Sequence, residues 1–390
     1  MSTLVAGAGI AGLVTALCLA RAGQEATLVE RRTGFSEAGA GLQLSPNASR
    51  VLLSLGLGPA LRRAAAAPER LVVRAVRSGR VIGGAALGES MEERFGAPYL
   101  VAHRADLQTL LLDAVRGRSG IRLLLGREAA AAGSAGDHAT LDVRRGAAAE
   151  TLRADLVVGA DGVWSGLRRS LGDPRTPRYQ GATAWRATLP VSALPGLDPA
   201  EVGLWLGKGR HVVHYRLPGG RLNLVAVEQR RRPVEGWSSP GEPAEIAARF
   251  ADAAPPLRDL IHAVPEWRLW SLYDLPARRM AAGRVALLGD AAHPVLPYLA
   301  QGAALAIEDA AALAAALAEA GPPTEPASVP EALRRFEAAR LRRARAVQRA
   351  ARRNGRAYHA GPPLSLARDL VMRRLGPEGM TARYGWLYGA

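Results

Sequence analysis

Apolar runs and helical segments alternate along the N-terminal part of the chain, which predicts an α/β fold. Residues 3–6 and 26–30 are typical of buried strands, and residues 13–22 form an apolar helix between them. Two later apolar runs, 154–159 and 284–288, are each followed within two residues by an acid, Asp161 and Asp290. Because ligands of open parallel sheets bind beyond the carboxyl ends of the strands, we expect both acids at a ligand site.

The pattern changes from about Tyr179, where apolar and polar residues alternate as in half-buried strands. Pro218-Gly219-Gly220 indicates a hairpin turn, and the chain is expected to be helical from roughly Ala327. The pattern predicts strands over 181–189, 202–206, 211–217 and 221–228, with a strand or two from 71–87, and helices over 48–55, over 107–115 and around Arg168 and Arg169.

The first strand and helix are joined by Gly7-Ala8-Gly9-Ile10-Ala11-Gly12, the glycine spacing of a dinucleotide-binding turn. Gly7 is expected to make the tight turn, Gly9 to admit a pyrophosphate, and Gly12 to let helix and strand pack closely. Glu30 ends the second strand, where an acid accepts hydrogen bonds from ribose hydroxyls. A glycine-rich turn that binds nothing is the alternative.

The segment from Gly289 to Gly302 follows a predicted strand, carries Asp290 and two prolines, and leads into an alanine-rich helix that begins near Gln301 or Gly302. A carboxylate accepts hydrogen bonds from hydroxyls, and the free N–H groups of a helix N-terminus favour negative charge. We therefore expect this segment to hold a polyhydroxylated, negatively charged ligand.

Composition narrows the class of protein. The 390 residues carry a formal net charge of +16, but Lys208 is the only lysine and the arginines are spread along the chain, so we expect no nucleic-acid partner. No apolar run approaches the roughly 18 residues of a membrane span. The single cysteine, Cys18, fits a reducing cytoplasm.

With these motifs, the sequence resembles the single-component FAD-dependent aromatic hydroxylases, the group A flavoprotein monooxygenases. The resemblance rests on Gly7 to Gly12, on Asp161-Gly162, and on Gly289-Asp290-Ala291-Ala292-His293-Pro294. The residues from Leu296 to Gly302 are most similar to the subgroup of 3-hydroxybenzoate 6-hydroxylase, salicylate 1-hydroxylase and 6-hydroxynicotinate 3-monooxygenase. The C-terminal residues near Trp386 and Tyr388 are also similar to that subgroup, although Gly385 stands where the subgroup is expected to have an acid.

The resemblance implies an α/β (α+β overall) architecture: a Rossmann-type FAD-binding domain, an inserted antiparallel substrate sheet and C-terminal helices. Non-covalent FAD, NADH or NADPH, O2 and a small hydroxylated aromatic acid are the implied ligands; a homodimer is left open. The expected boundaries are 1–70, 98–178 and 276–320 for the FAD-binding domain, 71–97 and 179–275 for the sheet domain, and 327–390 for the helical segment. The implied FAD-binding residues are Gly7, Gly9, Gly12, Glu30, Arg31, Gln43, Arg104, Asp161, Asp290, Pro297 and Gly302.

The implied reaction is hydroxylation of the ring through a C4a-hydroperoxyflavin, and it requires an activated phenolate. Transfer of a phenolic proton to an ordinary imidazole is uphill by about 5 kcal/mol. The subgroup's His-x-x-x-Tyr pattern falls on His211 and Tyr215, so we expect His211 to be the base and Tyr215 to position the substrate, with Gln301 in the same pocket. A surface imidazole is the alternative for His211; His214, on the other strand face, is expected to be structural.

Arg186, Arg210 and Arg221 are candidate partners for a substrate carboxylate, and the sequence does not choose among them. No residue spacing indicates a metal site. A urate-type hydroxylase or an epoxidase would use the same flavin chemistry on another ring. A non-catalytic flavin-binding protein would need the glycine turn and Glu30 but not His211.

Overall fold

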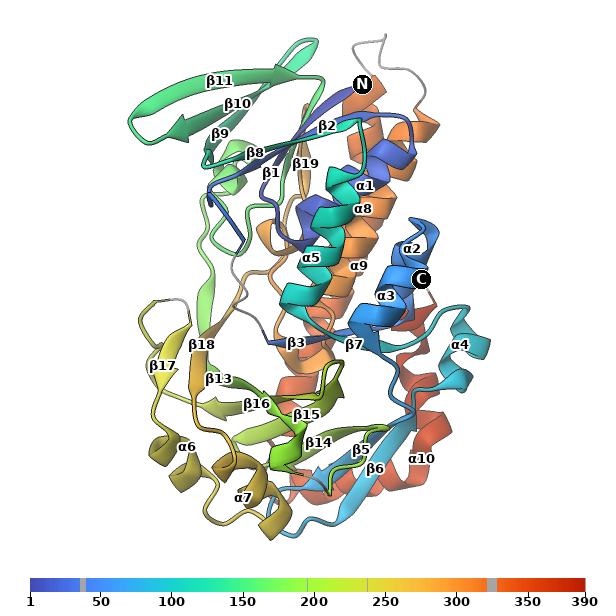
Figure 1. Ribbon diagram of the computed structural model, residues 1–390, viewed down its shortest axis with the longest axis vertical. Helices are drawn as coiled ribbons and strands as arrows, with labels where there is room; N and C mark the ends of the chain where they lie inside the picture. Colours follow the sequence, from blue (N-terminus) through green and yellow to red (C-terminus); the bar gives the residue numbers. More distant parts are fainter. Residues whose placement is uncertain (36–39, 195, 237, 321–327, 390) are drawn as a thin grey trace.

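The computed structural model describes residues 1–35, 40–194, 196–236, 238–320 and 328–389. Figure 1 shows an elongated molecule in which the N-terminal strands lie at one end, a second sheet lies at the other, and long helices run along the side. The segments on which the resemblance rests lie between these ends.

The sheet at the N-terminal end is the expected Rossmann-type sheet. Its strands pair in parallel except β19 with β20, which are antiparallel. In spatial order they are β19 (Ala281–Ala282), β20 (Val285–Leu287), β12 (Leu156–Gly159), β1 (Ser2–Ala6), β2 (Glu25–Glu30) and β8 (Ile121–Leu125). The apolar helices α1 (Ile10–Arg21), α5 (Arg104–Arg116) and α8 (Gly302–Glu319) lie beside it (Figure 1).

The sheet at the opposite end contains the predicted alternating strands. Its neighbouring strands are antiparallel except β14 with β5, which are parallel, so the sheet is mixed rather than purely antiparallel. In spatial order they are β17 (Ser239–Gly241), β18 (Trp267–Asp274), β13 (Arg178–Pro190), β16 (Arg221–Gln229), β15 (Arg210–Leu217), β14 (Glu201–Gly207), β5 (Arg70–Ala75) and β6 (Val81–Ala86). The hairpin at Pro218-Gly219-Gly220 is confirmed by the pairing of β15 with β16.

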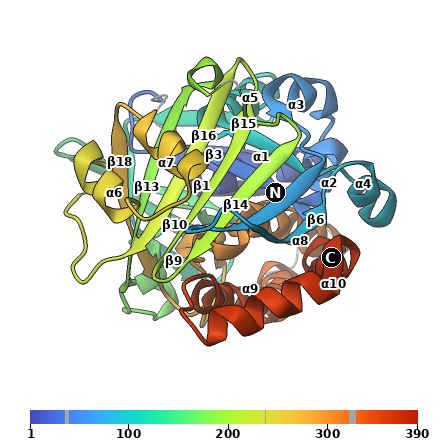
Figure 2. The same cartoon turned by 90° about the horizontal axis from the view of Figure 1, so that it is seen from below.

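One face of this second sheet is covered by α6 (Pro243–Arg249) and α7 (Pro255–His262), as Figure 2 shows. Val212, Leu224 and Trp267 on this face pack into one apolar cluster with Ile246 and Leu257 of the helices. The opposite face therefore points toward the rest of the molecule, and it carries His211 and Tyr215, which the sequence assigned to catalysis.

Smaller elements connect the sheets. The expected helix around Arg168 and Arg169 forms as the short 3₁₀ helix η1 (Leu167–Leu171). Strands β9 (Glu128–Ala135), β10 (His138–Arg145) and β11 (Ala148–Ala154) form a separate small sheet at the N-terminal end (Figure 1). Strands β3 (Gly41–Leu44), β7 (Leu100–His103) and β4 (Ala65–Ala66) form another. The remaining elements are α2 (Pro46–Ser54), α3 (Gly58–Ala64), α4 (Glu89–Phe95), η2 (Val191–Ala193), η3 (Gly289–Ala291) and η4 (Pro297–Leu299).

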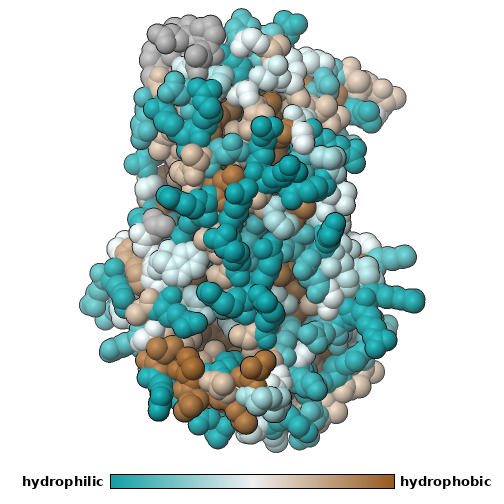
Figure 3. Space-filling view, turned by 180° about the vertical axis from the view of Figure 1, so that it is seen from behind, coloured by the Kyte–Doolittle hydropathy of each residue, from teal (hydrophilic) through white to brown (hydrophobic). Residues whose placement is uncertain are grey.

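The C-terminal part is helical, as predicted, in α9 (Ser328–Tyr358) and α10 (Leu364–Tyr388). Gly376, with φ 60°, kinks α10 just before Pro377. Leu364, Leu366 and Leu370 of α10 are exposed. Figure 3, which shows the molecule from behind, has hydrophobic residues gathered at its lower end. Among the described residues, no helix combines the length and apolar character needed to cross a membrane.

Candidate active site

The glycine turn between β1 and α1 has the geometry that a dinucleotide requires. Gly7 has φ 102°, a conformation that favours glycine. A Cβ at Gly12 would lie 1.9 Å from the Gly7 carbonyl oxygen, whereas a Cβ at Gly9 would meet nothing within 4 Å. Gly12 is therefore needed for packing, and Gly9 leaves open space beside the helix N-terminus where a pyrophosphate binds.

Glu30 is buried at the end of β2 and holds the turn in place. Its Oε2 accepts a hydrogen bond from the Ala8 N–H at 2.8 Å, and its Oε1 accepts one from the Arg32 N–H at 3.0 Å. A carboxylate has further lone pairs, so ribose hydroxyls could still donate to it. Arg31 is exposed next to it and lines a cavity of about 550 Å³ together with Arg144.

Asp161 and Asp290 follow the paired strands β12 and β20, where Gly159 lies opposite Leu287. Asp161 Oδ2 accepts from the Leu167 N–H at 3.4 Å, while its Oδ1 is buried without a hydrogen-bond partner among the described residues. Burial raises the pKa of Asp161. A buried acceptor left unpaired is a place where a ligand hydroxyl or N–H fits.

The loop carrying Asp290 is held by Arg168, which sequence reasoning placed on a helix without a role. Arg168 is buried, and its Nε donates to the Ala291 carbonyl at 3.0 Å while its Nη2 reaches the Asp290 carbonyl at 3.4 Å. The Asp290 side chain itself is exposed. The arginine fixes the backbone, so the Asp290 carboxylate is left to face a ligand.

The helix that follows this loop begins at Gly302, as predicted. Ala300 has φ 53°, a conformation uncommon for alanine, and it turns the chain from Pro297 into the helix. A Cβ at Gly302 would meet nothing within 4 Å, so the first turn of α8 is open to a ligand. Its free N–H groups favour a group that carries negative charge.

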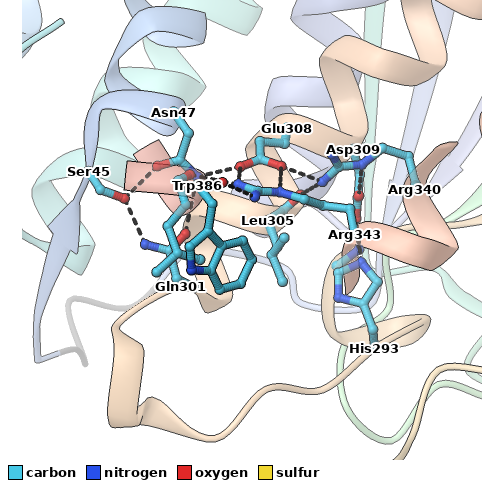
Figure 4. Close-up of polar contacts among 12 residues, drawn as sticks. Ser45, Asn47, His293, Gln301, Leu305, Glu308, Asp309, Arg340, Arg343 and Trp386 are labelled. Atoms are coloured by element: carbon cyan, nitrogen blue, oxygen red, sulfur yellow. Dashed lines mark hydrogen bonds and ion pairs between the residues drawn. The ribbon is translucent and has the colours of Figure 1, made fainter. Parts of the chain in front are cut away.

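Gln301 lies in a buried polar network that joins α8 to the β3–α2 turn (Figure 4). Its Nε2 donates to Ser45 Oγ at 2.8 Å, and its Oε1 accepts from Asn47 Nδ2 at 3.1 Å. Asn47 also donates to Glu308. Both ends of the Gln301 amide are therefore engaged, which suits a residue that positions the loop beside it.

The same network continues along α8 to His293 (Figure 4). Arg340 donates from Nε to Asp309 at 2.7 Å and forms an ion pair with Glu308 at 2.7 Å. His293 Nε2 donates to Asp309 Oδ2 at 2.6 Å. These buried charges compensate one another and tie the Asp290 loop to α8 and α9.

His211 and Tyr215 lie on the face of the second sheet opposite α6 and α7. His211 is buried. The centroid of its ring lies 5.5 Å from the ring centroid of Tyr298 and 5.5 Å from that of Tyr358. Its Nδ1 lies 2.8 Å from His359 Nε2. Burial, and secondarily the charge of His359, keeps the pKa of His211 well below 6.5. The ring is therefore neutral near pH 7 and has a free lone pair, although its lowered pKa makes it a weaker base than an ordinary imidazole.

Tyr215 is buried at the other end of the strand, next to β3. A Cβ at Gly41 would lie 2.7 Å from its hydroxyl oxygen, and the Gly41 N–H donates to Asn223 at 2.6 Å. Burial raises the pKa of Tyr215, so its hydroxyl stays protonated and can donate. His214 lies on the opposite face near Trp205, where burial lowers its pKa to about 4.

Arg186 lies on β13, two strands from β15, at the level of Val213, which is midway between His211 and Tyr215 in β15. Arg186 pairs with Val225 of β16, and Val225 pairs with Val213 of β15. The three residues therefore form one row across the sheet, on the face that carries His211 and Tyr215. The guanidinium lies 4.9 Å from the Trp270 ring, and the buried Nε has no hydrogen-bond partner among the described residues. Desolvation by burial lowers the pKa of Arg186 to about 10.

The two other candidate arginines are paired elsewhere. Arg210 forms hydrogen bonds with Asp252 and with the Arg249 carbonyl. Arg221 pairs with Asp106 at the start of α5. Arg186 instead lines a cavity of about 120 Å³ together with Asp290 and Pro297.

Two remaining predicted residues lie on the β3–β7 side of the site. Gln43 accepts a hydrogen bond from the Tyr99 hydroxyl. Arg104 begins α5, where its backbone N–H donates to the Ala40 carbonyl at 3.1 Å and its side chain is exposed. The sequence also predicts that the glycine-rich segment 38–48 runs close to a flat ligand, and its first two residues, Ala38 and Gly39, lie outside the described residues. In the part of the chain that is described, no group of three or more His, Cys, Asp or Glu forms a metal site.

Comparison with known proteins gives a family match over residues 1–351 to the FAD binding domain. The chain is 40% identical over 393 residues to 3-amino-4-hydroxybenzoate 2-monooxygenase PtnB3 of Streptomyces platensis, covering 99% of this chain and 95% of that protein. It is 34% identical over 390 residues to 3-hydroxybenzoate 6-hydroxylase 1 of Aquipseudomonas alcaligenes, covering 99% and 97%. The structure of Klebsiella pneumoniae HpxO with FAD and uric acid matches with TM-score 0.84 and 27% identity, covering 97% and 94%.

The chain belongs to the FAD-dependent aromatic hydroxylases. This membership confirms the resemblance, the fold class and FAD as the cofactor. The residues fit the cofactor on structural grounds as well: the open space at Gly9, the unpaired Oδ1 of Asp161 and the open first turn of α8 are suited to phosphate, hydroxyl and flavin groups respectively.

Proposed function

We propose that this chain hydroxylates a small aromatic acid that bears a phenolic hydroxyl, with His211 as the base that removes the phenolic proton. One observation carries the proposal. His211 and Tyr215 flank a row of the sheet in which Val213 and Val225 supply an apolar surface and Arg186 supplies a positive charge. The four residue steps from His211 to Tyr215 span about 13 Å, enough to admit one aromatic ring between the polar ends.

Each polar group would have its own part in the reaction. Bound FAD supplies oxygen transfer after reduction by NADH or NADPH and reaction with O2. His211, neutral at pH 7, accepts the phenolic proton and so raises electron density in the ring. Tyr215, protonated at pH 7, donates a hydrogen bond that orients the substrate. Gln301 holds the loop from Pro297 against Ser45 and Asn47.

Arg186 is the proposed partner of the substrate carboxylate. Arg210 and Arg221 already pair with Asp252 and Asp106, whereas the Nε of Arg186 is buried and unpaired among the described residues. Hydrogen bonds between charged groups are stronger than neutral ones, and a planar guanidinium matches a carboxylate. The positive charge would also stabilise the phenolate as it forms.

The cofactor half would be held by the residues at the strand ends. We propose that Gly7, Gly9, Gly12 and Glu30 hold the ADP half of FAD, that Asp290 binds near the ribityl chain, and that Gly302 begins the helix that faces the flavin. Arg31, Gln43, Arg104, Asp161 and Pro297 complete the proposed FAD-binding set. The predicted domain boundaries and a cytoplasmic location stay part of this proposal.

The test is to follow NADH and NADPH oxidation by the FAD-loaded protein against a panel of aromatic compounds. The panel contains 3-amino-4-hydroxybenzoate, 3-hydroxybenzoate, salicylate, 6-hydroxynicotinate and urate. Stimulation by one acid, with hydroxylated product, supports the proposal and identifies the substrate. Stimulation by urate alone would favour the urate-type alternative, which the similarity to HpxO motivates. No stimulation by any hydroxylated ring would overturn the assignment.

A further inference from the structure

A second buried histidine lies directly behind the proposed base. His359 follows the last residue of α9 and is separated from His211 by 148 positions, yet its Nε2 lies 2.8 Å from His211 Nδ1. The two ring centroids are 5.1 Å apart. We propose that His359 receives from His211 the proton that the substrate phenol loses, and passes it to solvent. This inference rests on the proposed role of His211.

The hydrogen bond between the two rings fixes how a proton could pass. At least one of the two facing nitrogens must carry a hydrogen for the contact to be a hydrogen bond. If His211 Nδ1 is the donor, its Nε2 has a free lone pair that can accept the phenolic proton. The O–H bond of the phenol breaks as an N–H bond forms at His211 Nε2. The proton on His211 Nδ1 then moves to His359 Nε2, and His359 Nδ1 releases one to water.

The surroundings make His211 a poor place for a proton to stay. The ring of Tyr298 packs against both histidines, the ring of Tyr358 packs against His211, and only 3% of His211 is exposed. Burial lowers the pKa of His211 well below 6.5 and that of His359 to about 4, so both imidazoles are neutral at pH 7. Charge on either ring is therefore disfavoured, and a proton left on His211 would return to the phenolate unless the proton on its Nδ1 passed at the same time to His359.

His359 is placed toward the surface end of this path. Its side chain is 9% exposed, and it belongs to the connection between α9 and α10. The Gly209 N–H donates to its carbonyl at 3.0 Å, which fixes the connection to the β14–β15 turn. At the same connection, Lys208 lies beside Gly361, and Arg368 donates to the Tyr358 carbonyl.

The experiment measures proton release and phenolate formation in the same mixing reaction. FAD-loaded protein in weak buffer with a pH indicator is mixed with 3-amino-4-hydroxybenzoate, and phenolate absorbance is followed beside the indicator. In the unaltered protein, both signals should rise together. In His359→Gln, both should slow by about ten- to hundredfold, and added imidazole should restore part of the rate. His214→Gln is the matched control, because His214 is a buried histidine on the opposite strand face.

The possible results separate the relay from the proposed function. A His359→Gln protein that forms phenolate and releases the proton at the unaltered rate overturns the relay alone. The absence of phenolate in the unaltered protein overturns the role of His211 and the relay with it. Flavin absorbance reports whether each variant is folded. If His359→Gln loses FAD, His359→Phe is measured instead, because phenylalanine keeps the ring packing against Tyr298 but carries no proton, and the same slow release is expected.

Discussion

His293 donates from Nε2 to Asp309 Oδ2 at 2.6 Å in the interior between α8 and α9. Burial alone would raise the pKa of Asp309, but the charge of His293 and that of Arg340 lower it to about 2. Burial alone would lower the pKa of His293, but Asp309 raises it above 6.5. The pair therefore connects the loop of the proposed flavin site to the stability of the whole fold.

The first prediction concerns stability against acid. Because the folded pKa of Asp309 is depressed, its contribution is fully present above about pH 4 and is lost as the pH falls toward about 2. Asp309→Asn leaves Arg340 and His293 without their buried partner and should cost about 3–5 kcal/mol near neutral pH. Urea unfolding between pH 2 and pH 7 measures this, and the variant should show a smaller pH dependence over the acid range.

A surface carboxylate is the control for that experiment. Asp113 pairs with Arg116 on the surface, where the side chains are 67% and 60% exposed. Asp113→Asn should change the unfolding free energy by no more than about 1 kcal/mol. Equal losses in the two variants would show that the buried network adds nothing beyond ordinary surface pairing. On the alkaline side, the contribution of His293 is present below its unfolded pKa and is lost as the pH rises through its raised folded value.

The second prediction separates two glycines of the first turn. Gly12→Ala places a methyl group 1.9 Å from the Gly7 carbonyl oxygen, so the apoprotein should lose at least about 1–3 kcal/mol of stability. Gly9→Ala meets nothing within 4 Å, so the apoprotein should unfold at the unaltered temperature but bind FAD more weakly. Thermal unfolding without FAD and titration with FAD distinguish them. Tight FAD binding by Gly9→Ala would show that the pyrophosphate lies elsewhere.

These two glycines also show what the sequence could predict. The spacing of Gly7, Gly9 and Gly12 between a strand and a helix depends on local chemistry, so the β1–α1–β2 unit and the start of α8 were predictable. The hairpin at Pro218 was predictable for the same reason. Strand β18 was missed, because its tryptophans follow no clear alternation with neighbouring polar residues. The small sheet of β9, β10 and β11 was missed because alanine and glycine dominate much of it.

The least predictable features join residues far apart in the chain. His359 lies next to His211 only because the end of α9 packs against the second sheet. Arg168 reaches the Asp290 loop across 122 positions, and no local pattern marks it. The choice among three arginines likewise depended on which acids they meet in the fold. Periodicity and motif spacing contain no information about such contacts.

The third prediction tests Arg186 as the partner of the carboxylate. Arg186→Gln should raise KM for the carboxylate-bearing substrate about ten- to hundredfold, because a hydrogen bond to a charged group contributes about 1.5–3 kcal/mol. Affinity for the same ring without its carboxylate should change little. Arg210→Gln is the matched control, because Arg210 lies on the same sheet as Arg186 but already pairs with Asp252. Equal losses with and without the carboxylate would assign Arg186 to the flavin or to folding.

The central claim is that His211 removes the phenolic proton, and the pH profile of hydroxylation in His211→Gln tests it most directly. With FAD bound, hydroxylation at pH 7 should fall by about 10²- to 10⁴-fold. It should recover as the pH approaches the pKa of the free phenol, because the substrate then arrives already ionised, while His214→Gln keeps the original profile. Product formation by His211→Gln at the unaltered rate and with the unaltered pH profile would contradict the account.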